Sequence, residues 1–179
     1  MFEFKIDLND EDYLQFNYYH SSNSPMGKRT LLYYRFQMYI LSALCILVFF
    51  IARADRLLIF IEAIFLGIVS ILWFIFSKKR YFGLIRKRIL RMKREGKLPY
   101  HTHVTLRFEE DEIHESTPEI ELRVKYSLIE KIAVTEHGVY IYHSSMHAFL
   151  LPNTVFSSEE EKLKFLEFIN RKAHGLREK

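Results

Sequence analysis

Residues 57–97 read LLIFIEAIFLGIVSILWFIFSKKRYFGLIRKRILRMKREGK, a long apolar run followed directly by a strongly basic one. A second apolar run, LLYYRFQMYILSALCILVFFIA, occupies residues 31–52. Each run holds about twenty mostly apolar residues, enough at a rise of about 1.5 Å per residue to cross a hydrocarbon layer of about 30 Å. Buried helices of a soluble bundle would carry a polar stripe, and residues 40–52 have almost none. The sequence therefore predicts a transmembrane hairpin over 31–76, with helices at 31–52 and 57–76 joined by a tight turn.

The basic run predicts the orientation of this hairpin. Residues 77–97 contain ten Lys and Arg and a single acid, Glu95, whereas the turn holds only Arg53 and Arg56 as cations. Short flanks rich in Lys and Arg stay in the cytoplasm, so both termini are expected there. Of the net charge of +4, residues 78–97 contribute about +9 and the rest of the chain about −5. Such a local patch argues against nucleic-acid binding, for which cations spread over the folded surface.

The basic amphipathic juxtamembrane segment, 77–97, is also a candidate contact with lipid headgroups. If it is helical, Tyr81, Ile85, Ile89 and Met92 share one side and most cations lie elsewhere, the pattern of an interfacial helix. Each cation near an anionic leaflet contributes about 1 kcal/mol. Alternatively, the charges only fix the orientation and are otherwise solvated, and the two interpretations are compatible. The candidate headgroup contacts are Lys78, Lys79, Arg80, Arg86, Lys87, Arg88, Arg91, Lys93 and Arg94.

The remaining chain has the pattern of short strands followed by one helix. Residues 2–8, FEFKIDL, alternate apolar and polar side chains, which predicts a strand with one buried face. Further strands are predicted in HVTLRF, EIELRVKY, KIAVTE, VYIYHS and HAFLLP, and in the second of these the alternating apolar residues are Ile120, Leu122, Val124 and Tyr126. A final helix is predicted after a cap at Ser157 or Ser158, with an inward stripe of Leu163, Leu166 and Ile169 and with Gly175 near its end.

These elements predict an α+β membrane protein. A two-helix transmembrane hairpin is inserted into a small antiparallel β-sheet or open barrel, which a C-terminal helix closes as in a pleckstrin-homology-like (PH-like) domain. Residues 1–30 supply the first strand, a short helix near DEDYLQFNYYH and a Ser/Asn/Pro-rich linker at 21–25. Residues 98–179 supply the rest of this cytosolic domain.

Glu62 is an ionisable residue inside the second predicted span, which by default marks a functional contact. It lies roughly 8 Å below the start of that helix, close enough to reach interfacial water, Arg53 or Arg56. The alternative is a contact within an oligomer or with a membrane partner, alongside a small residue such as Ser42. Two helices cannot enclose a pore, so an ion pathway would require several copies.

No sequence motif indicates catalysis. The chain lacks a P-loop, a GxSxG elbow, an HExxH helix and a dinucleotide-binding glycine pattern, so it is predicted not to be an enzyme and to need no cofactor. His101 and His103 are two residues apart on the outward side of a predicted strand, a spacing that favours surface histidines over a metal site. The single cysteine, Cys45, excludes an intramolecular disulfide.

Several stretches resemble the YcxB-like family of bacterial two-pass membrane proteins. They are the initial strand, Glu11-Asp12-Tyr13 with Tyr18, Tyr19 and His20, the two spans, Tyr126-Ser127-Leu128-Ile129, and Leu151-Pro152 with Phe156. The resemblance covers nearly the whole chain. It implies a cytosolic C-terminal domain on a two-pass anchor, and it implies no catalytic residues.

The expected function is that of a non-enzymatic two-pass protein of the bacterial inner membrane. Its PH-like domain is expected to bind lipid headgroups of the anionic leaflet or a protein partner, and further copies of the chain are a third expected partner. The alternative is an immunity protein that protects the membrane against a secreted membrane-active toxin. The short outward turn favours contact within the bilayer for that mechanism.

Overall fold

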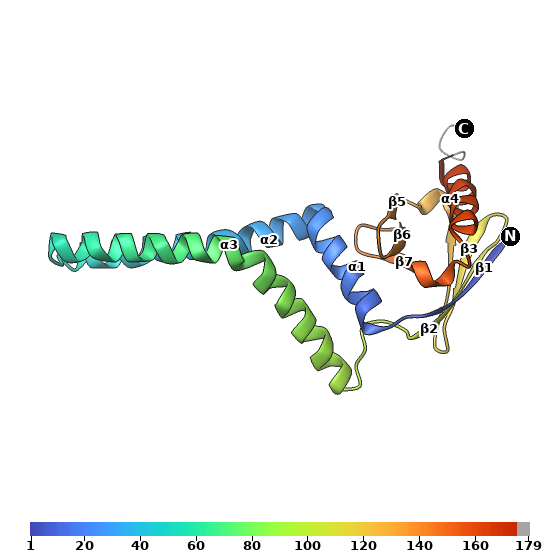
Figure 1. The fold of residues 1–179 in the computed structure, drawn as a ribbon, viewed down its shortest axis with the longest axis horizontal. Helices are drawn as coiled ribbons and strands as arrows, with labels where there is room; N and C mark the ends of the chain where they lie inside the picture. The colour runs from blue at the N-terminus through green and yellow to red at the C-terminus, as the bar shows by residue number, and fades with distance from the viewer. Residues whose placement is uncertain (175–179) are drawn as a thin grey trace. The chain divides into compact units, whose positions relative to one another are not determined.

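A computed structural model describes residues 1–174 of the chain, which form two units (Figure 1). One unit combines Met1–Phe16 with the chain from Met92 onward, and the other comprises Asn17–Arg91. The first is built mainly of strands and the second of helices. The fold is thus α+β, with two long apolar helices followed by a β-sheet region.

Three helices follow the first strand: α1 (Asp10–Asn23), α2 (Pro25–Ile51) and α3 (Arg56–Arg94). The predicted linker at residues 21–25 is wrong, because α2 begins almost where α1 ends. Ser24 caps α2 by accepting a 2.9 Å hydrogen bond from the Gly27 amide, and Pro25 occupies the first turn, where its missing N–H costs nothing. Gly27 also allows a close approach, because a Cβ there would collide with the Ser21 backbone.

Helix α3 does not end at residue 76 but continues through most of the basic segment. Figure 1 shows it changing direction between its apolar and basic parts. Ser77, which separates these parts, is buried and donates a 2.8 Å hydrogen bond to the Phe74 carbonyl. Serine bonded back to the preceding turn is a recognised cause of helix bending. The helix ends at Arg94, and Gly96 just after it has a left-handed φ of 69° and donates its amide to the Lys93 carbonyl.

The strands form two antiparallel sheets. The four-stranded sheet has the order β1 (Phe2–Asp7), β2 (His103–Phe108), β3 (Glu112–Ser116) and β4 (Glu121–Lys125). The three-stranded sheet has the order β5 (Lys131–Val134), β6 (Gly138–Tyr142) and β7 (Ala148–Pro152). The N-terminal strand pairs along its length with β2, from Phe2 opposite Phe108 to Asp7 opposite His103. The two helices α2 and α3 are therefore inserted between neighbouring strands of one sheet.

Helix α4 (Glu159–His174) closes a core shared by both sheets. Its cap is the predicted one: Ser158 Oγ accepts from the Glu161 amide at 3.1 Å, and Glu161 in turn accepts from the Ser157 amide at 2.7 Å. Phe165 is fully buried, with its ring centre 5.1 Å from that of Phe4. The core joins side chains of β1, β2, β6, β7 and α4, among them Phe4, Leu106, Phe108, Ile141, Leu151, Phe165 and Ile169.

Three predictions about these elements are corrected. Leu163 is 59% exposed, because the inward stripe of α4 runs through Phe165, Ile169 and Ala173. Ile120 is 56% exposed, and Leu122 is also exposed at the edge strand β4. Strand β3 was not predicted, since its sequence, EIHES, lacks a clear apolar alternation. Gly175 lies outside the described residues.

Candidate functional site

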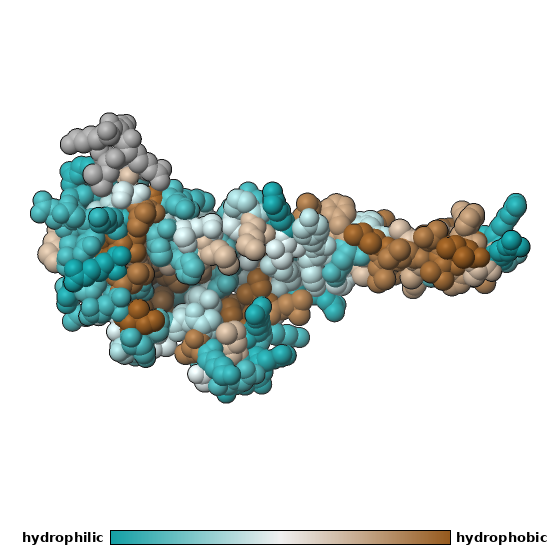
Figure 2. All heavy atoms as spheres, turned by 180° about the vertical axis from the view of Figure 1, so that it is seen from behind, coloured by the Kyte–Doolittle hydropathy of each residue, from teal (hydrophilic) through white to brown (hydrophobic). Residues whose placement is uncertain are grey.

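Helices α2 and α3 expose an extensive apolar surface. Each is long and apolar enough to cross a membrane, and only 6% of its most apolar window is buried. Leu41 is 53% exposed and Phe50 is 71% exposed. Figure 2 shows hydrophobic residues covering most of the visible surface of these helices toward the turn that joins them. Folded soluble proteins rarely expose apolar patches of this size, so the two helices indicate membrane association.

The two helices contact each other through a few polar groups. The Oγ atoms of Ser42 and Ser70 are buried and 3.0 Å apart, which joins α2 to α3 by a hydrogen bond. Trp73 Nε1 donates to the Tyr34 carbonyl at 3.1 Å, and the two rings are 5.2 Å apart. Small hydroxyl side chains allow close helix approach in an apolar medium. Ser42 is therefore engaged within the hairpin rather than facing outward.

The basic part of α3 presents cations without acidic partners. The side chains of Lys79, Arg86, Lys87, Arg88 and Arg91 are exposed, and no ion pair involves any of them within residues 1–174. The same holds for Lys78, Arg80 and Arg94. This part of the helix is therefore a strongly positive surface with little internal neutralisation.

The apolar side of this basic part is covered by protein. Ile89 is 5% exposed, and Tyr81, Ile85 and Met92 are half-buried. Part of this packing is visible at Phe82, whose ring lies 4.7 Å from that of Tyr18 in α1. The predicted apolar stripe thus exists, but it packs against protein and is not exposed.

Lys93 differs from the other candidate headgroup contacts. Its Nζ atom pairs with Asp10 Oδ2 at 2.6 Å, and the Tyr100 hydroxyl donates to the other carboxylate oxygen at 2.6 Å. The hydrogen bond from Lys93 and, to a smaller extent, that from Tyr100 lower the pKa of Asp10. Burial and the hydrogen bond to Asp10 raise the pKa of Tyr100. Lys93 therefore fastens the end of α3 to the start of α1, and its charge is already compensated.

A second group of cations lies over aromatic rings where α2 and α3 face each other. Arg35 lies over the Phe74 ring, with its Cζ atom 5.1 Å from the ring centre, and Arg80 lies over Trp73 at 5.3 Å. We call Tyr34, Arg35, Trp73, Phe74 and Arg80 the cation–aromatic cluster. Arg35 Nε is buried and has no hydrogen-bond partner among the described residues. Cation–π contacts hold both guanidinium groups in place while leaving N–H groups available to donate.

Arg35 is not among the candidate site residues predicted from the sequence. A signal for a site was present, because this arginine lies inside the apolar run of residues 31–52, directly between Tyr34 and Phe36. An ionisable residue within a membrane segment is a functional hypothesis by default. Its ring partner Phe74, thirty-nine residues away, could not be identified from the sequence.

Glu62 is half-buried on the side of α3 that also carries Ser70 and Trp73. Those two residues contact α2, so Glu62 belongs to the seam between the helices. In the part of the chain that the structure describes, neither Arg53 nor Arg56 forms an ion pair with it. The expected local pairing is therefore not formed.

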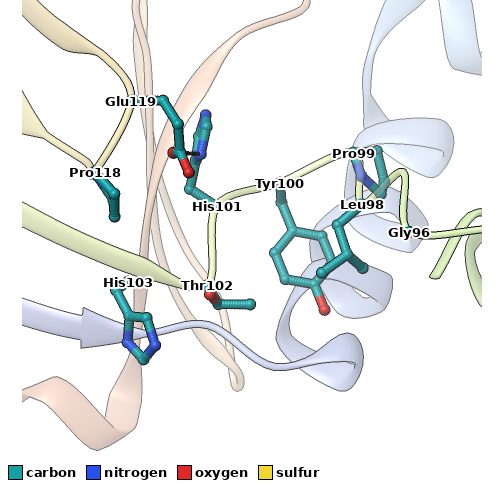
Figure 3. A pocket seen from close by; sticks show the side chains of 9 residues that line it. All are labelled: Gly96, Leu98, Pro99, Tyr100, His101, Thr102, His103, Pro118 and Glu119. Atoms are coloured by element: carbon teal, nitrogen blue, oxygen red, sulfur yellow. Dashed lines mark ion pairs between the residues drawn. The ribbon is translucent and has the colours of Figure 1, made fainter.

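The strand-rich unit has an open surface cavity of about 460 Å³ after the end of α3 (Figure 3). His101 and Glu119 face each other there, with His101 Nδ1 2.9 Å from Glu119 Oε2, and Tyr100 points away from this pair. His103 Nδ1 lies 2.7 Å from Asp7 Oδ1, in a pair that is mostly exposed. Because each histidine has its own carboxylate, the cavity offers no uncompensated charge for a ligand.

Two further carboxylates differ in their surroundings. Burial raises the pKa of Glu115, which the nearby His101 partly opposes. The hydroxyl and the amide of Ser157 donate to Glu161 and lower its pKa. The first belongs to the sheet near the cavity, and the second belongs to the cap of α4.

Comparison with known proteins identifies one family. The family model described as YcxB-like protein matches residues 108–169, which run from the end of β2 to the last turns of α4. No curated protein and no solved structure matches the chain. The matched range includes Tyr126-Ser127-Leu128-Ile129, Leu151-Pro152 and Phe156, on which part of the resemblance was based. The resemblance of this chain to the YcxB-like family is therefore confirmed over residues 108–169.

Proposed function

We propose that the chain is a non-enzymatic two-pass inner-membrane protein with both termini in the cytoplasm. In this proposal α2 and α3 span the bilayer, and the unit of strands and α4 is a PH-like domain on the cytoplasmic side. The basic part of α3 binds the headgroups of the anionic leaflet. The surface of the domain then remains for a protein partner.

The single observation that carries this proposal is the set of unneutralised cations on α3. Arg86, Lys87, Arg88 and Arg91 lie within less than two turns of one helix, and no acidic side chain within residues 1–174 pairs with them. Four cations near an anionic surface contribute about 4 kcal/mol at about 1 kcal/mol each. Because the apolar stripe of the same segment is covered, this attraction is largely electrostatic and is expected to weaken as salt rises.

The distribution of charge supports the orientation. Lys28 and Arg29 precede the apolar part of α2, and the basic part of α3 follows its apolar part, so the cations gather at one end of the antiparallel pair. The opposite end is the turn, where the negative charge of Asp55 offsets one of the two positive charges of Arg53 and Arg56. This asymmetry favours the basic end in the cytoplasm.

The arrangement of strands supports the PH-like proposal. A four-stranded and a three-stranded antiparallel sheet share one core, and a single C-terminal helix covers it. That is the order and layering expected of a PH-like domain from the sequence. No contact of the described residues favours the immunity function or an ion pathway, so both stay predictions without structural support.

Lysine footprinting of the full-length chain tests the proposal. The protein is reconstituted into phosphatidylcholine bilayers with or without phosphatidylglycerol, and the acetylation rate of each lysine is measured by mass spectrometry. Lys79 and Lys87 are expected to react several-fold more slowly when phosphatidylglycerol is present at about 0.05 M salt, and to lose this protection at about 0.5 M salt.

Lys5 and Lys125 serve as internal controls, because both are exposed on strands of the domain. Their acetylation rates are expected to be the same in both kinds of bilayer. Any effect of salt on these rates is expected to come from the reactivity of the acetylating reagent. Equal rates at Lys79 and Lys87 with and without phosphatidylglycerol at low salt would contradict the proposed headgroup binding.

A further inference from the structure

We infer that the cation–aromatic cluster is a discrete binding site for the phosphate of an anionic phospholipid, with Arg35 as its central donor. The inference rests on the proposed membrane insertion and deepens it. The basic part of α3 would attract the leaflet as a whole, whereas the cluster would hold one headgroup in a defined position.

The position of the cluster fits a headgroup. Arg35 lies four residues after the start of the predicted first span and Trp73 three residues before the end of the second, which places them about 6 Å and about 5 Å from the respective ends. Tryptophan and tyrosine rings favour this interfacial level. The Trp73 indole is already fixed by its hydrogen bond to the Tyr34 carbonyl.

The chemistry of Arg35 fits a phosphate. Its Cζ atom lies 5.1 Å from the centre of the Phe74 ring, a contact that uses none of its N–H groups. The Nε atom is buried and unpaired among the described residues, whereas the Arg35 side chain as a whole is only partly buried, so the end of the guanidinium group is the part that an anionic oxygen can reach. A guanidinium group can donate two parallel hydrogen bonds to a phosphate, which an ammonium group cannot do in the same fixed geometry.

The surroundings select for net negative charge and for acyl chains. The sequence of α2 contains no acid and that of α3 contains only Glu62, at the far end of the span, so neither helix offers a carboxylate beside the cluster to the ammonium group of a zwitterionic lipid. Lys78 and Arg80, each stacked on a ring, would repel it. Phe36 and Phe76 are exposed beside the cluster and offer apolar contact to the acyl chains of a lipid. A free phosphate has no acyl chains and would gain nothing from this contact.

Trp73 provides a direct readout, because it is the only tryptophan of the chain. Full-length protein is reconstituted into phosphatidylcholine bilayers in which a small, equal fraction of either phosphatidylglycerol or phosphatidylcholine carries bromine near the headgroup end of its acyl chains. Bromine quenches tryptophan fluorescence at short range. Wild type is expected to show about fivefold enrichment of phosphatidylglycerol next to Trp73.

Substitutions separate the site from general attraction. Arg35→Gln is expected to abolish the preference, and Arg35→Lys, which keeps the charge but not the fork, to retain only part of it. Arg29→Gln removes the same charge from α2 outside both the cluster and the basic part of α3, and is expected to leave the preference intact. Helix content by circular dichroism checks that each variant is folded. Should Arg35→Gln not fold, the Arg35→Lys and Arg29→Gln pair decides the question alone.

Three results would overturn the inference. The first is equal quenching by both brominated lipids in wild type. The second is an equal loss of preference in Arg35→Lys and Arg29→Gln. The third is loss of the preference when glycerol phosphate is added in solution, which would assign the cluster to a free phosphate. Lipid-dependent protection of Lys79 and Lys87 with no preference at Trp73 would leave the proposed function standing and reject the site.

Discussion

Phe165→Ala is expected to detach the N-terminal strand from the rest of the domain. Phe165 is fully buried in α4, and its ring centre lies 5.4 Å from that of Phe2, 5.1 Å from Phe4 and 4.8 Å from Phe108. It therefore contacts both β1 and β2, strands that the two membrane-length helices separate in the sequence. Removing it takes away the side chain that holds these strands under the helix.

The magnitude follows from the burial. A fully buried phenylalanine replaced by alanine costs about 3–5 kcal/mol, because apolar transfer is lost and a cavity is left. At about 1.4 kcal/mol per factor of ten, this corresponds to an opening equilibrium larger by roughly two to three and a half orders of magnitude. If neighbouring rings move into the cavity left by Phe165, the destabilisation is expected at the lower end of the 3–5 kcal/mol range, about 3 kcal/mol.

Hydrogen–deuterium exchange of the full-length chain in lipid nanodiscs measures this equilibrium at β1. The amides of residues 2–7 are expected to exchange faster in Phe165→Ala by about the factor given above. Leu163→Ala is the matched control, because it makes a similar truncation on the same helix at a side chain that is 59% exposed. Its cost is expected to stay within about 0.5 kcal/mol.

The reasoning would be refuted if Leu163→Ala accelerated the exchange of β1 as much as Phe165→Ala. It would also be refuted if Phe165→Ala accelerated exchange only in α4. The first result would indicate that Leu163 faces the core, as predicted from the sequence. The second would show that β1 does not depend on the helix.

Two further perturbations test the domain. Gly138→Ala is expected to lower the melting temperature by an amount equivalent to about 1–3 kcal/mol, because the new Cβ would collide with the Leu151 carbonyl oxygen. Gly83→Ala is the control, because its Cβ would meet no other atom. This variant is expected to leave the melting temperature unchanged or to raise it. Glu161 has a pKa lowered by Ser157, so its contribution to stability is present above its ordinary pKa of 4.5 and is lost as pH falls through the lowered value. Thermal unfolding between pH 6 and about pH 3 is expected to show this loss in wild type and not in Glu161→Gln, and an identical pH dependence in both proteins would contradict the assignment.

Much of the fold could be predicted because its signals are local. The apolar runs define α2 and α3 by length, the alternation of FEFKIDL defines β1, and Ser158 with Glu161 defines the start of α4. Each of these patterns is formed by side chains of one continuous stretch of the sequence. None requires knowledge of a distant partner.

The errors arose where distant contacts decide. In α4, stripes through Leu163 and through Phe165 both have helical spacing, and only the aromatic side chains of β1 and β2 favour Phe165. Lys162 lies on the inward side and would argue against that stripe, yet its stem is covered and its Nζ atom reaches to 3.8 Å from Glu159. Local pattern alone does not separate these two choices.

The candidate site shows the same division. The basic part of α3 is visible as composition, and its exposure without acidic partners follows from the same composition. The covering of Ile89, the pairing of Lys93 with Asp10 and the stacking of Arg35 on Phe74 all join residues far apart in the sequence. These contacts change which of the predicted cations are free to bind.

The most direct test of the central claim is cysteine accessibility in intact cells. In a Cys45→Ser background, Ala54→Cys places a single thiol in the turn between α2 and α3, and Lys125→Cys places one on β4. A membrane-impermeant maleimide applied from outside the inner membrane is expected to label the thiol at position 54 and to reach position 125 only after lysis. Labelling of position 125 without lysis, or recovery of the folded chain in the aqueous fraction without detergent, would contradict a two-pass protein with its domain in the cytoplasm.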